Sequence, residues 1–345
     1  MLYVTTRNKT KTCTSLQALS EISGSDGGHF IPHELHAFSE TEIKNLGKKS
    51  FAEACAEIVN LLFDTNLDSW AISFAIGRYP VKLIPVGNRT VVAETWHNPG
   101  WRFERLARGI EKAIRQSDQI CPVPTDWLMI GSRIAVLFGI FSDLIRSGAV
   151  STDTPMDLVV PSFDFSSVMA CWYARKLGLP IHNVLCCCNE NAGIWNLIHR
   201  GEVRTDTAVT KTDTPLCDRP APAGLERLIA ETLGSVRAVD FFRCREKGET
   251  FYLEPHELQQ LRSGLFATVV SAGQMENSIS ALYGSNGYIP DPYTALCVAG
   301  IGTYRSKTGE SRSALVLSEE SPRHHMPLLA RSLGTTAEVL KKAID

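Results

Sequence analysis

Apolar residues recur at helical spacing between Phe51 and Leu62, which places them on one face of a helix. Ser50, directly before them, is a suitable N-cap, and Glu53 three residues later completes a capping box. The pattern therefore predicts a helix that ends at about Phe63. Similar spacing predicts further helices, over residues 102–115, 129–147, 190–199, 225–233, 255–263, 274–283, 294–300, 327–333 and 336–344.

A strand pattern, a helix pattern and a second strand pattern follow one another in the middle of the chain. Asp157–Pro161 is a short, β-branched apolar run, which is typical of a buried parallel strand. A helical pattern follows from Val168 to about Leu177, and Leu179–Cys188 has the composition of a second strand. Because this succession is a βαβ unit, it predicts an α/β fold with an open, mostly parallel sheet and helices on both faces. Further strands are expected at residues 90–94 and 313–317.

Composition and charge narrow the class of protein. Of the 345 residues, 44% are hydrophobic, which suffices for a large core and, at roughly 150 residues per domain, suggests about two domains. The 35 basic and 37 acidic residues nearly balance, so a dedicated nucleic-acid binder is not expected. The longest apolar run, Ile134–Ile140, is too short to span a bilayer, and residues 1–13 lack the apolar core of a signal peptide. We therefore expect a cytoplasmic protein with no membrane partner.

The cysteines fit the same expectation. There are ten of them, none forms a C-x-x-C pair, and three are consecutive at Cys186–Cys188. Adjacent cysteines make poor disulfide partners for each other, because a disulfide needs a defined separation of its two Cα atoms. Small apolar residues in a reducing compartment are therefore expected, in preference to zinc ligands or a disulfide framework.

Several short motifs occur in the order in which one enzyme family carries them. Ser25–Pro32 (SDGGHFIP) resembles "DGGLFVP", Ala174–Ile181 resembles "AKKMGLPI", and residues 291–295 (DPYTA) resemble "DPHTAV". The shared order covers nearly the whole chain and resembles threonine synthase, a pyridoxal-phosphate (PLP) enzyme of the tryptophan-synthase-β-like fold type II. The resemblance implies that fold, with residues 1–85 as an N-terminal α/β segment and residues 86–345 as the large α/β domain.

The segment that carries the PLP-binding lysine in the family differs here. The family motif "HGPTxAFKD" corresponds to His97–Arg105 (HNPGWRFER), and Glu104 stands at the lysine position. A carboxylate cannot form an imine with an aldehyde, so no PLP cofactor is expected. His97 and Glu104 remain candidates for an acid–base pair in the former active site. For Glu104 the alternative is a carboxylate that the helix dipole favours at a helix start.

The loop that would bind the cofactor phosphate is also altered. The family motif "PTGNFG" corresponds to Pro161–Ser166, with Phe163 and Ser166 in place of two glycines. Asp164 adds a negative charge that, ~4 Å from another anion at an effective dielectric constant near 20, would cost on the order of 4 kcal/mol. Capping of the following helix is the other role open to Asp164. The hydroxyl group of Ser162 could still bind a neutral ligand.

A remnant of the cofactor pocket is expected at the carboxyl ends of the strands, where ligands of open α/β sheets bind. Asn189 and Asn191 match the family motif "TNxN", although turn geometry would equally explain them, and Glu319 aligns with the residue that contacts the pyridine nitrogen. The small domain with its "SGDTG" loop is expected to be largely missing, because only residues 105–125 precede the next family helix. The expected remnant comprises Ser162, Phe163, Asp164, Ser166, Asn189, Asn191 and Glu319.

Three functions follow from these departures. The first is a catalytically degenerate threonine synthase-like protein that acts as a binding or partner subunit. The second is a repurposed, PLP-independent enzyme that uses the remnant pocket for a small amino-acid-related metabolite, and the third is a divergent threonine synthase-like lyase. Loss of the small domain would expose apolar surface, so a homo-oligomer or a protein partner is expected. His324 and His325 beside two glutamates could form a metal cluster, but a solvated loop is the favoured interpretation, and no metal is expected.

Overall fold

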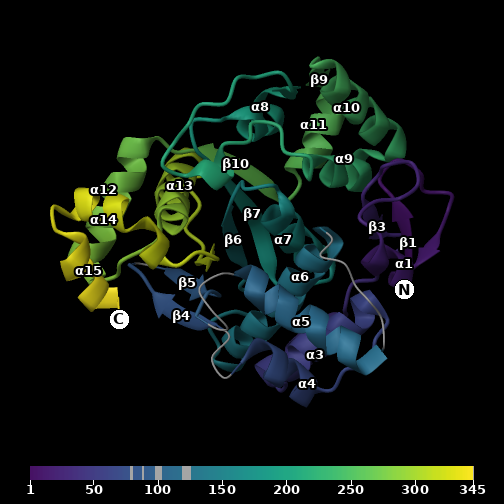
Figure 1. Cartoon of the computed structure of the whole chain (residues 1–345), viewed down its shortest axis with the longest axis horizontal. Helices are drawn as coiled ribbons and strands as arrows, with labels where there is room; N and C mark the ends of the chain where they lie inside the picture. Colours follow the sequence, from purple (N-terminus) through teal and green to yellow (C-terminus); the bar gives the residue numbers. More distant parts are fainter. Residues whose placement is uncertain (78–80, 88, 98–102, 119–125, 345) are drawn as a thin grey trace.

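A six-stranded sheet forms the centre of the protein (Figure 1). The structure, a computed structural model, describes residues 1–77, 81–87, 89–97, 103–118 and 126–344, and the side chains of residues 103–106 and 117–118 are not described. Five strands are parallel and the edge strand β4 is antiparallel to β5. The predicted α/β fold with a mostly parallel sheet is therefore confirmed. In spatial order the strands are β10 (Leu265–Val269), β7 (Ile181–Cys188), β6 (Met156–Pro161), β11 (Ala314–Ser318), β5 (Thr90–Glu94) and β4 (Lys82–Pro85).

Helices cover both faces of this sheet, because the inner strands are apolar on both sides. Successive side chains of a strand point to opposite faces. Leu158 of β6 accordingly lies in one core and Val159 in the other. The same alternation explains the consecutive cysteines of β7: Cys186 and Cys188 lie in the first core, Cys187 lies in the second, and all three are fully buried. The described cysteines are all free thiols.

Each core is built by a separate group of helices. The helices of the first core pack on the face of the sheet where α6 lies. The C-terminal helices build the second core (Figure 1). Helices of the first core include α3 (Phe51–Phe63), α5 (Phe103–Asp118), α6 (Asp126–Arg146), α7 (Ser166–Lys176), α8 (Gly193–Arg200), α9 (Leu225–Leu233) and α10 (Ser235–Lys247). Helices of the second are α12 (Ala272–Asn286), α13 (Pro292–Thr308), α14 (Met326–Leu333) and α15 (Ala337–Ile344).

The N-terminal residues form a small antiparallel sheet that is tied to α9. Two hydrogen-bonded contacts of 3.0 Å join the Arg7 guanidinium to both carboxylate oxygens of Glu226, and the Thr6 hydroxyl donates to the same carboxylate at 2.5 Å. The Glu226 side chain is fully buried, so the pair forms a fixed link between distant parts of the sequence. The remaining elements are β1 (Leu2–Thr5), β2 (Cys13–Thr14), β3 (Phe30–Pro32), α1 (Ser15–Ser20), α2 (Glu40–Leu46), α4 (Ser69–Ile76), β8 (Glu202–Arg204), β9 (Thr250–Tyr252) and α11 (Pro255–Arg262).

Predicted and observed elements agree best where local signals are strong. The capping box of α3 is present: Ser50 Oγ accepts from the Glu53 backbone N–H at 3.3 Å, and Glu53 Oε2 accepts from the Ser50 N–H at 2.6 Å. Helix α6 begins three residues before its predicted start at residue 129. Within the described residues, α6 is the one helix long and apolar enough to cross a membrane, with a mean hydropathy of 1.8, but 83% of that window is buried inside the protein.

Candidate functional site

The loop between β6 and α7 keeps a backbone shape that suits glycine, although it contains none. The backbone φ angles of Phe163 and Phe165 are 38° and 76°, in the left-handed region that side chains rarely adopt. Each such residue stores strain on the order of 1–3 kcal/mol, which persists only where the surroundings fix the conformation. The Phe163 ring is nearly buried and packs edge-to-face on Tyr293, with ring centroids 5.0 Å apart. The loop therefore has a backbone conformation that suits glycine, and the Phe163 side chain makes a hydrophobic contact within the protein.

Asp164 places its own carboxylate at the N-terminus of α7. Its Oδ1 accepts from the backbone N–H of Ser166 at 3.0 Å and from the Ser166 hydroxyl at 2.6 Å. Burial would raise the pKa of Asp164, but these bonds and the charges of Arg133 and Arg219 bring the pKa below its usual value. The side chain is therefore ionised at neutral pH. A helix N-terminus is the place where the fold offers backbone N–H groups and a favourable dipole to an anion.

Glu319 follows strand β11, and its carboxylate pairs with Arg133 of helix α6. Arg133 of α6 donates from Nε to Oε1 at 2.9 Å and from Nη2 to Oε2 at 2.6 Å, and Ser167 Oγ donates to Oε1 at 2.9 Å. The side chains of the ion pair are only 7% and 6% exposed. This bidentate geometry fixes the orientation of both side chains and uses both oxygens of Glu319.

Asp164 and Arg133 line two small cavities. Their volumes are about 170 Å³ and about 240 Å³. Pockets for drug-sized ligands usually measure about 300–1,000 Å³, so each cavity is small for a cofactor. The first is lined by Arg133, Phe163, Asp164, Leu216, Arg219, Glu319 and Glu320. The second is lined by Ala107, Arg108, Glu111, Asp126, Leu128, Met129, Arg133, Asp164 and Ser166.

His97 lies near the carboxyl end of β5 and is bonded to Glu94. The Nε2 atom of His97 shares a short hydrogen bond with Glu94 Oε2, and the Tyr288 hydroxyl donates to Glu94 Oε1 at 2.8 Å. Burial, together with the charges of Glu94 and Asp291, raises the pKa of Tyr288. The backbone of Glu104 belongs to the first turn of α5, but its side chain lies outside the described residues, so its pairing with His97 stays a prediction. The sequence alone did not identify Glu94, because its only local feature is its place as the last residue of a strand.

Asn189 and Asn191 hold a surface segment in place. The Asn189 side chain donates to Thr212 Oγ1 at 2.8 Å and to Asp218 Oδ1 at 2.7 Å. Asn191 donates to the same Asp218 oxygen at 3.0 Å, and its own Oδ1 accepts from the Thr210 backbone N–H at 2.9 Å. These bonds anchor the polar, Pro-rich segment that follows β8. Neither asparagine lines the two cavities, nor does Ser162.

The two histidines near the C-terminus lie on a 3-10 turn, Pro322–His325. His324 Nδ1 contacts Glu320 Oε2 at 3.0 Å, and His325 Nε2 lies 4.0 Å from the same oxygen. Across the described part of the chain, no group of three or more His, Cys, Asp or Glu side chains is arranged to hold a metal ion.

The sequence and the structure are similar to threonine synthases. A family model described as "Threonine synthase N terminus" matches residues 2–77. "Threonine synthase-like 1" of Pongo abelii is 29% identical over 160 residues, which is 45% of this chain and 21% of that protein. The protein of the same name from Mus musculus is 26% identical over 213 residues, 61% of this chain and 28% of that protein. This chain thus matches between 21% and 28% of the length of those two relatives.

Solved structures give the same result for the fold. The PLP-bound threonine synthase of Brucella melitensis aligns with a TM-score of 0.82 at 17% identity, over 97% of this chain and 92% of that one. The yeast threonine synthase also has a TM-score of 0.82 at 17% identity, over 99% and 93% of the two chains. The fold is therefore that of the threonine synthases. Within the sequence, the similarity to threonine synthases lies in residues 2–77, which the family model matches, and in the segments shared with the threonine synthase-like proteins.

The described residues of the phosphate loop do not fit PLP. The Ser166 backbone N–H at the start of α7 already donates to the Asp164 carboxylate. A phosphate dianion placed ~4 Å from that carboxylate would be repelled by on the order of 4 kcal/mol for each pair of charges. The Phe163 ring also lines the cavity of about 170 Å³ beside this carboxylate. The N–H group that could bind an anion at this helix start is therefore already bonded to a carboxylate of the same chain.

Proposed function

We propose that this threonine synthase-like protein is catalytically degenerate in PLP chemistry and acts as a binding or partner subunit. The observation that carries the proposal is the Asp164 carboxylate on the N-terminus of α7. Glu104 at the lysine position supports the proposal from the sequence, because no imine can form on it. The proposal includes a cytoplasmic location and a protein partner or a second copy of the chain.

The ion pair between Arg133 and Glu319 supports the same proposal. Two buried charges that pair with each other need no ligand to neutralise them, whereas one such charge left alone costs about 3–5 kcal/mol. Because Glu319 stands where the family contacts the pyridine ring, its use of both oxygens on Arg133 and Ser167 leaves this residue engaged inside the protein. Such a site is stable without a cofactor.

Absorbance spectroscopy with added PLP tests the proposal. The unmodified chain should show no aldimine band, and equilibrium dialysis should show no PLP uptake. Glu104→Lys alone should also give no band, because the phosphate loop is unchanged. Glu104→Lys combined with Phe163→Gly, Asp164→Asn and Ser166→Gly should give one.

A matched control separates specific binding from a chance reaction with a surface lysine. Glu111→Lys adds a lysine to the same helix, α5, and should give no band in either background. An aldimine band from the unmodified chain would overturn the proposal. Release of phosphate from O-phosphohomoserine, the family's substrate, would overturn it as well.

A second candidate function is a repurposed enzyme without PLP, acting on a small amino-acid-related metabolite. The polar cavity of about 170 Å³ favours it, because Arg219 and Glu320 lie at its lining and could orient a zwitterion. This function predicts that His97→Ala or Glu104→Gln abolishes a measurable turnover while the melting temperature stays nearly unchanged. Loss of activity only together with unfolding would count against it. The third candidate, a divergent lyase, requires the PLP uptake that equilibrium dialysis measures.

A further inference from the structure

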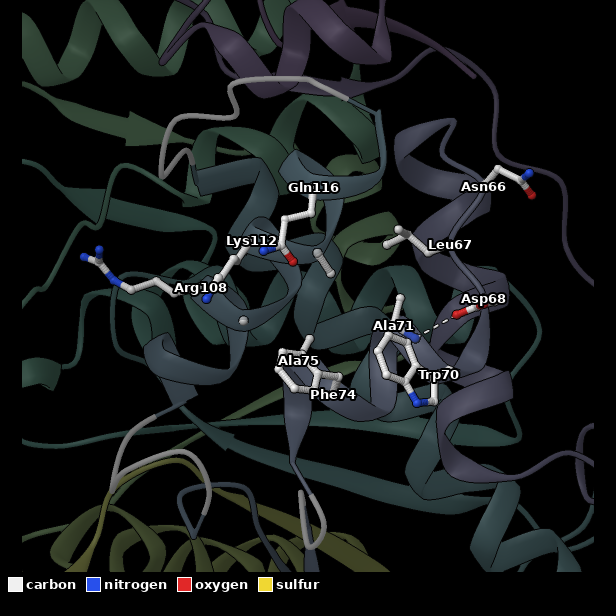
Figure 2. Close-up of a pocket in the computed structure, with 12 residues that line it drawn as sticks. Asn66, Leu67, Asp68, Trp70, Ala71, Phe74, Ala75, Arg108, Lys112 and Gln116 are labelled. Carbon is white, nitrogen blue, oxygen red and sulfur yellow. Dashed lines mark hydrogen bonds between the residues drawn. The ribbon is translucent and has the colours of Figure 1, made fainter.

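A groove of about 550 Å³ runs between α4 and α5 (Figure 2), and it shares Arg108 with the cavity of about 240 Å³ beside Asp164. Its floor consists of small residues, including Ala71, Ala75 and Gly109. The helices approach closely here, since a Cβ atom added to Gly109 would lie 2.3 Å from the carbonyl oxygen of Ala75. Small residues at the crossing thus create a depression whose two walls are formed by longer side chains from different helices.

One wall is an exposed pair of aromatic rings. Trp70 and Phe74, four residues apart on α4, are 73% and 71% exposed and stack with ring centroids 5.8 Å apart. The opposite side of α4 is apolar too, and there Ile72 and Ile76 are buried in the core. A short helix that is apolar on both sides normally buries both. Two large rings left in water mark an interaction surface.

The other wall carries positive charge. Arg108 and Lys112 of α5 line the groove one helical turn apart, and both are exposed; in Figure 2 the Arg108 side chain extends away from α4. Among the described side chains, neither has a carboxylate within ion-pair distance, whereas Arg115 on the same helix pairs with Glu111. The groove therefore combines an apolar anchor site with two positive charges that the described residues leave without a carboxylate.

We propose that this groove binds an acidic amphipathic segment of a partner protein. Apolar side chains of that segment would pack on Trp70 and Phe74, and its carboxylates would pair with Arg108 and Lys112. Such a segment matches the groove in both shape and charge. The inference rests on the binding role proposed above and names the partner's chemistry.

The charge of the groove and of the chain also argues against two other occupants, a second copy of this chain and a nucleic acid. A second copy of this chain in a two-fold interface would bring the same cationic wall against itself, because such an interface uses the same patch on both subunits. Two cations on a chain of net charge −2 are too few for a nucleic acid.

Fluorescence anisotropy with the full chain tests the groove. The probe is a labelled helical peptide of about 15 residues with Leu and Phe on one face and Glu on the other. We expect saturable binding that weakens as salt is added. Trp70→Ala and Lys112→Glu should each weaken binding roughly tenfold or more. Both positions are exposed, so circular dichroism should show an unchanged fold, and Phe74→Ala provides a second aromatic variant.

Two matched controls lie far from the groove. Tyr252→Ala removes another exposed ring, 62% accessible, and Lys341→Glu reverses an exposed lysine of α15, so both should bind the probe like the unmodified chain. Absence of binding, or equal binding of a peptide with Lys in place of Glu, would overturn the proposal. So would a dimer in light scattering that Trp70→Ala dissociates. These outcomes are independent of PLP uptake, which bears on the degenerate active site alone.

Discussion

Asp291 is a fully buried carboxyl group that should make stability depend on pH. It caps α13: Oδ1 accepts from the backbone N–H groups of Tyr293 and Thr294 at 2.9 and 3.1 Å, and Oδ2 accepts from the Ser318 hydroxyl at 3.0 Å and from the Thr294 hydroxyl. Burial raises its pKa from 3.8 to about 6, although these hydrogen bonds act in the opposite direction.

The size and sign of the effect follow from this pKa. Below pH 3.8 the carboxyl is protonated in both the folded and the unfolded chain. Between pH 3.8 and about 6 the unfolded chain loses the proton while the folded chain keeps it, so stability falls as pH rises. Above pH 6 the loss is complete. A shift of 6 − 3.8, or about 2 units, corresponds to on the order of 3 kcal/mol.

Urea unfolding of the unmodified chain and of Asp291→Asn, at several pH values from 4 to 7, measures this contribution. The amide can still accept from both backbone N–H groups and can donate to the two hydroxyls, so the fold should be preserved. The free energy of unfolding of the unmodified chain should fall relative to the variant by about 3 kcal/mol across this range. All other titrating groups cancel in the difference. Parallel pH profiles would refute the assignment of a raised pKa to Asp291.

Three further variants test the packing of the site and the scaffold. Glu319→Ala should lower the free energy of unfolding by about 3–5 kcal/mol in urea, because Arg133 is left buried without its partner. Glu226→Ala should have an effect of similar size, because it removes the carboxylate that Arg7 and Thr6 share. Gly109→Ala should lower the melting temperature and cost about 1–3 kcal/mol, since the added methyl group collides with the Ala75 carbonyl.

Each variant has a control. Arg133→Met together with Glu319→Leu should be more stable than Glu319→Ala alone, since both charges are removed. Arg7→Ala combined with Glu226→Ala should lower the free energy of unfolding little further than Glu226→Ala alone. For the glycine, Gly302→Ala in helix α13 meets no neighbouring atom and has no left-handed backbone, so it reports the effect of replacing a helical glycine without a collision. A melting temperature for Gly109→Ala equal to that of the unmodified chain would contradict the close helix approach.

Local signals predicted much of the fold. The β-branched run of β6, the βαβ succession and the capping box of α3 are encoded within a few residues, and each was placed close to its observed bounds. Strand β10 was not predicted, because its five residues, LFATV, become a strand through pairing with β7, far away in the sequence. Edge strand β4 was missed for the same reason.

The site was less predictable than the fold, because its contacts join distant residues. Motif order located the loop around Asp164 and the position of Glu319. It could not reveal that Glu319 pairs with Arg133, which lies 186 residues away in the sequence. The partners of Asn189 were equally hidden, since Asp218 belongs to a segment with no regular pattern.

The charged groups around the β6–α7 loop are paired with each other inside the chain. A helix N-terminus attracts an anion, and a buried arginine needs one. The Asp164 carboxylate is the anion at the N-terminus of α7, and the Glu319 carboxylate is the anion that pairs with Arg133. The left-handed backbone at Phe163 persists because the β6–α7 crossover and the contact with Tyr293 fix it from both sides. Each of these features is therefore satisfied within the chain, whereas the groove beside Trp70 and Lys112 remains exposed.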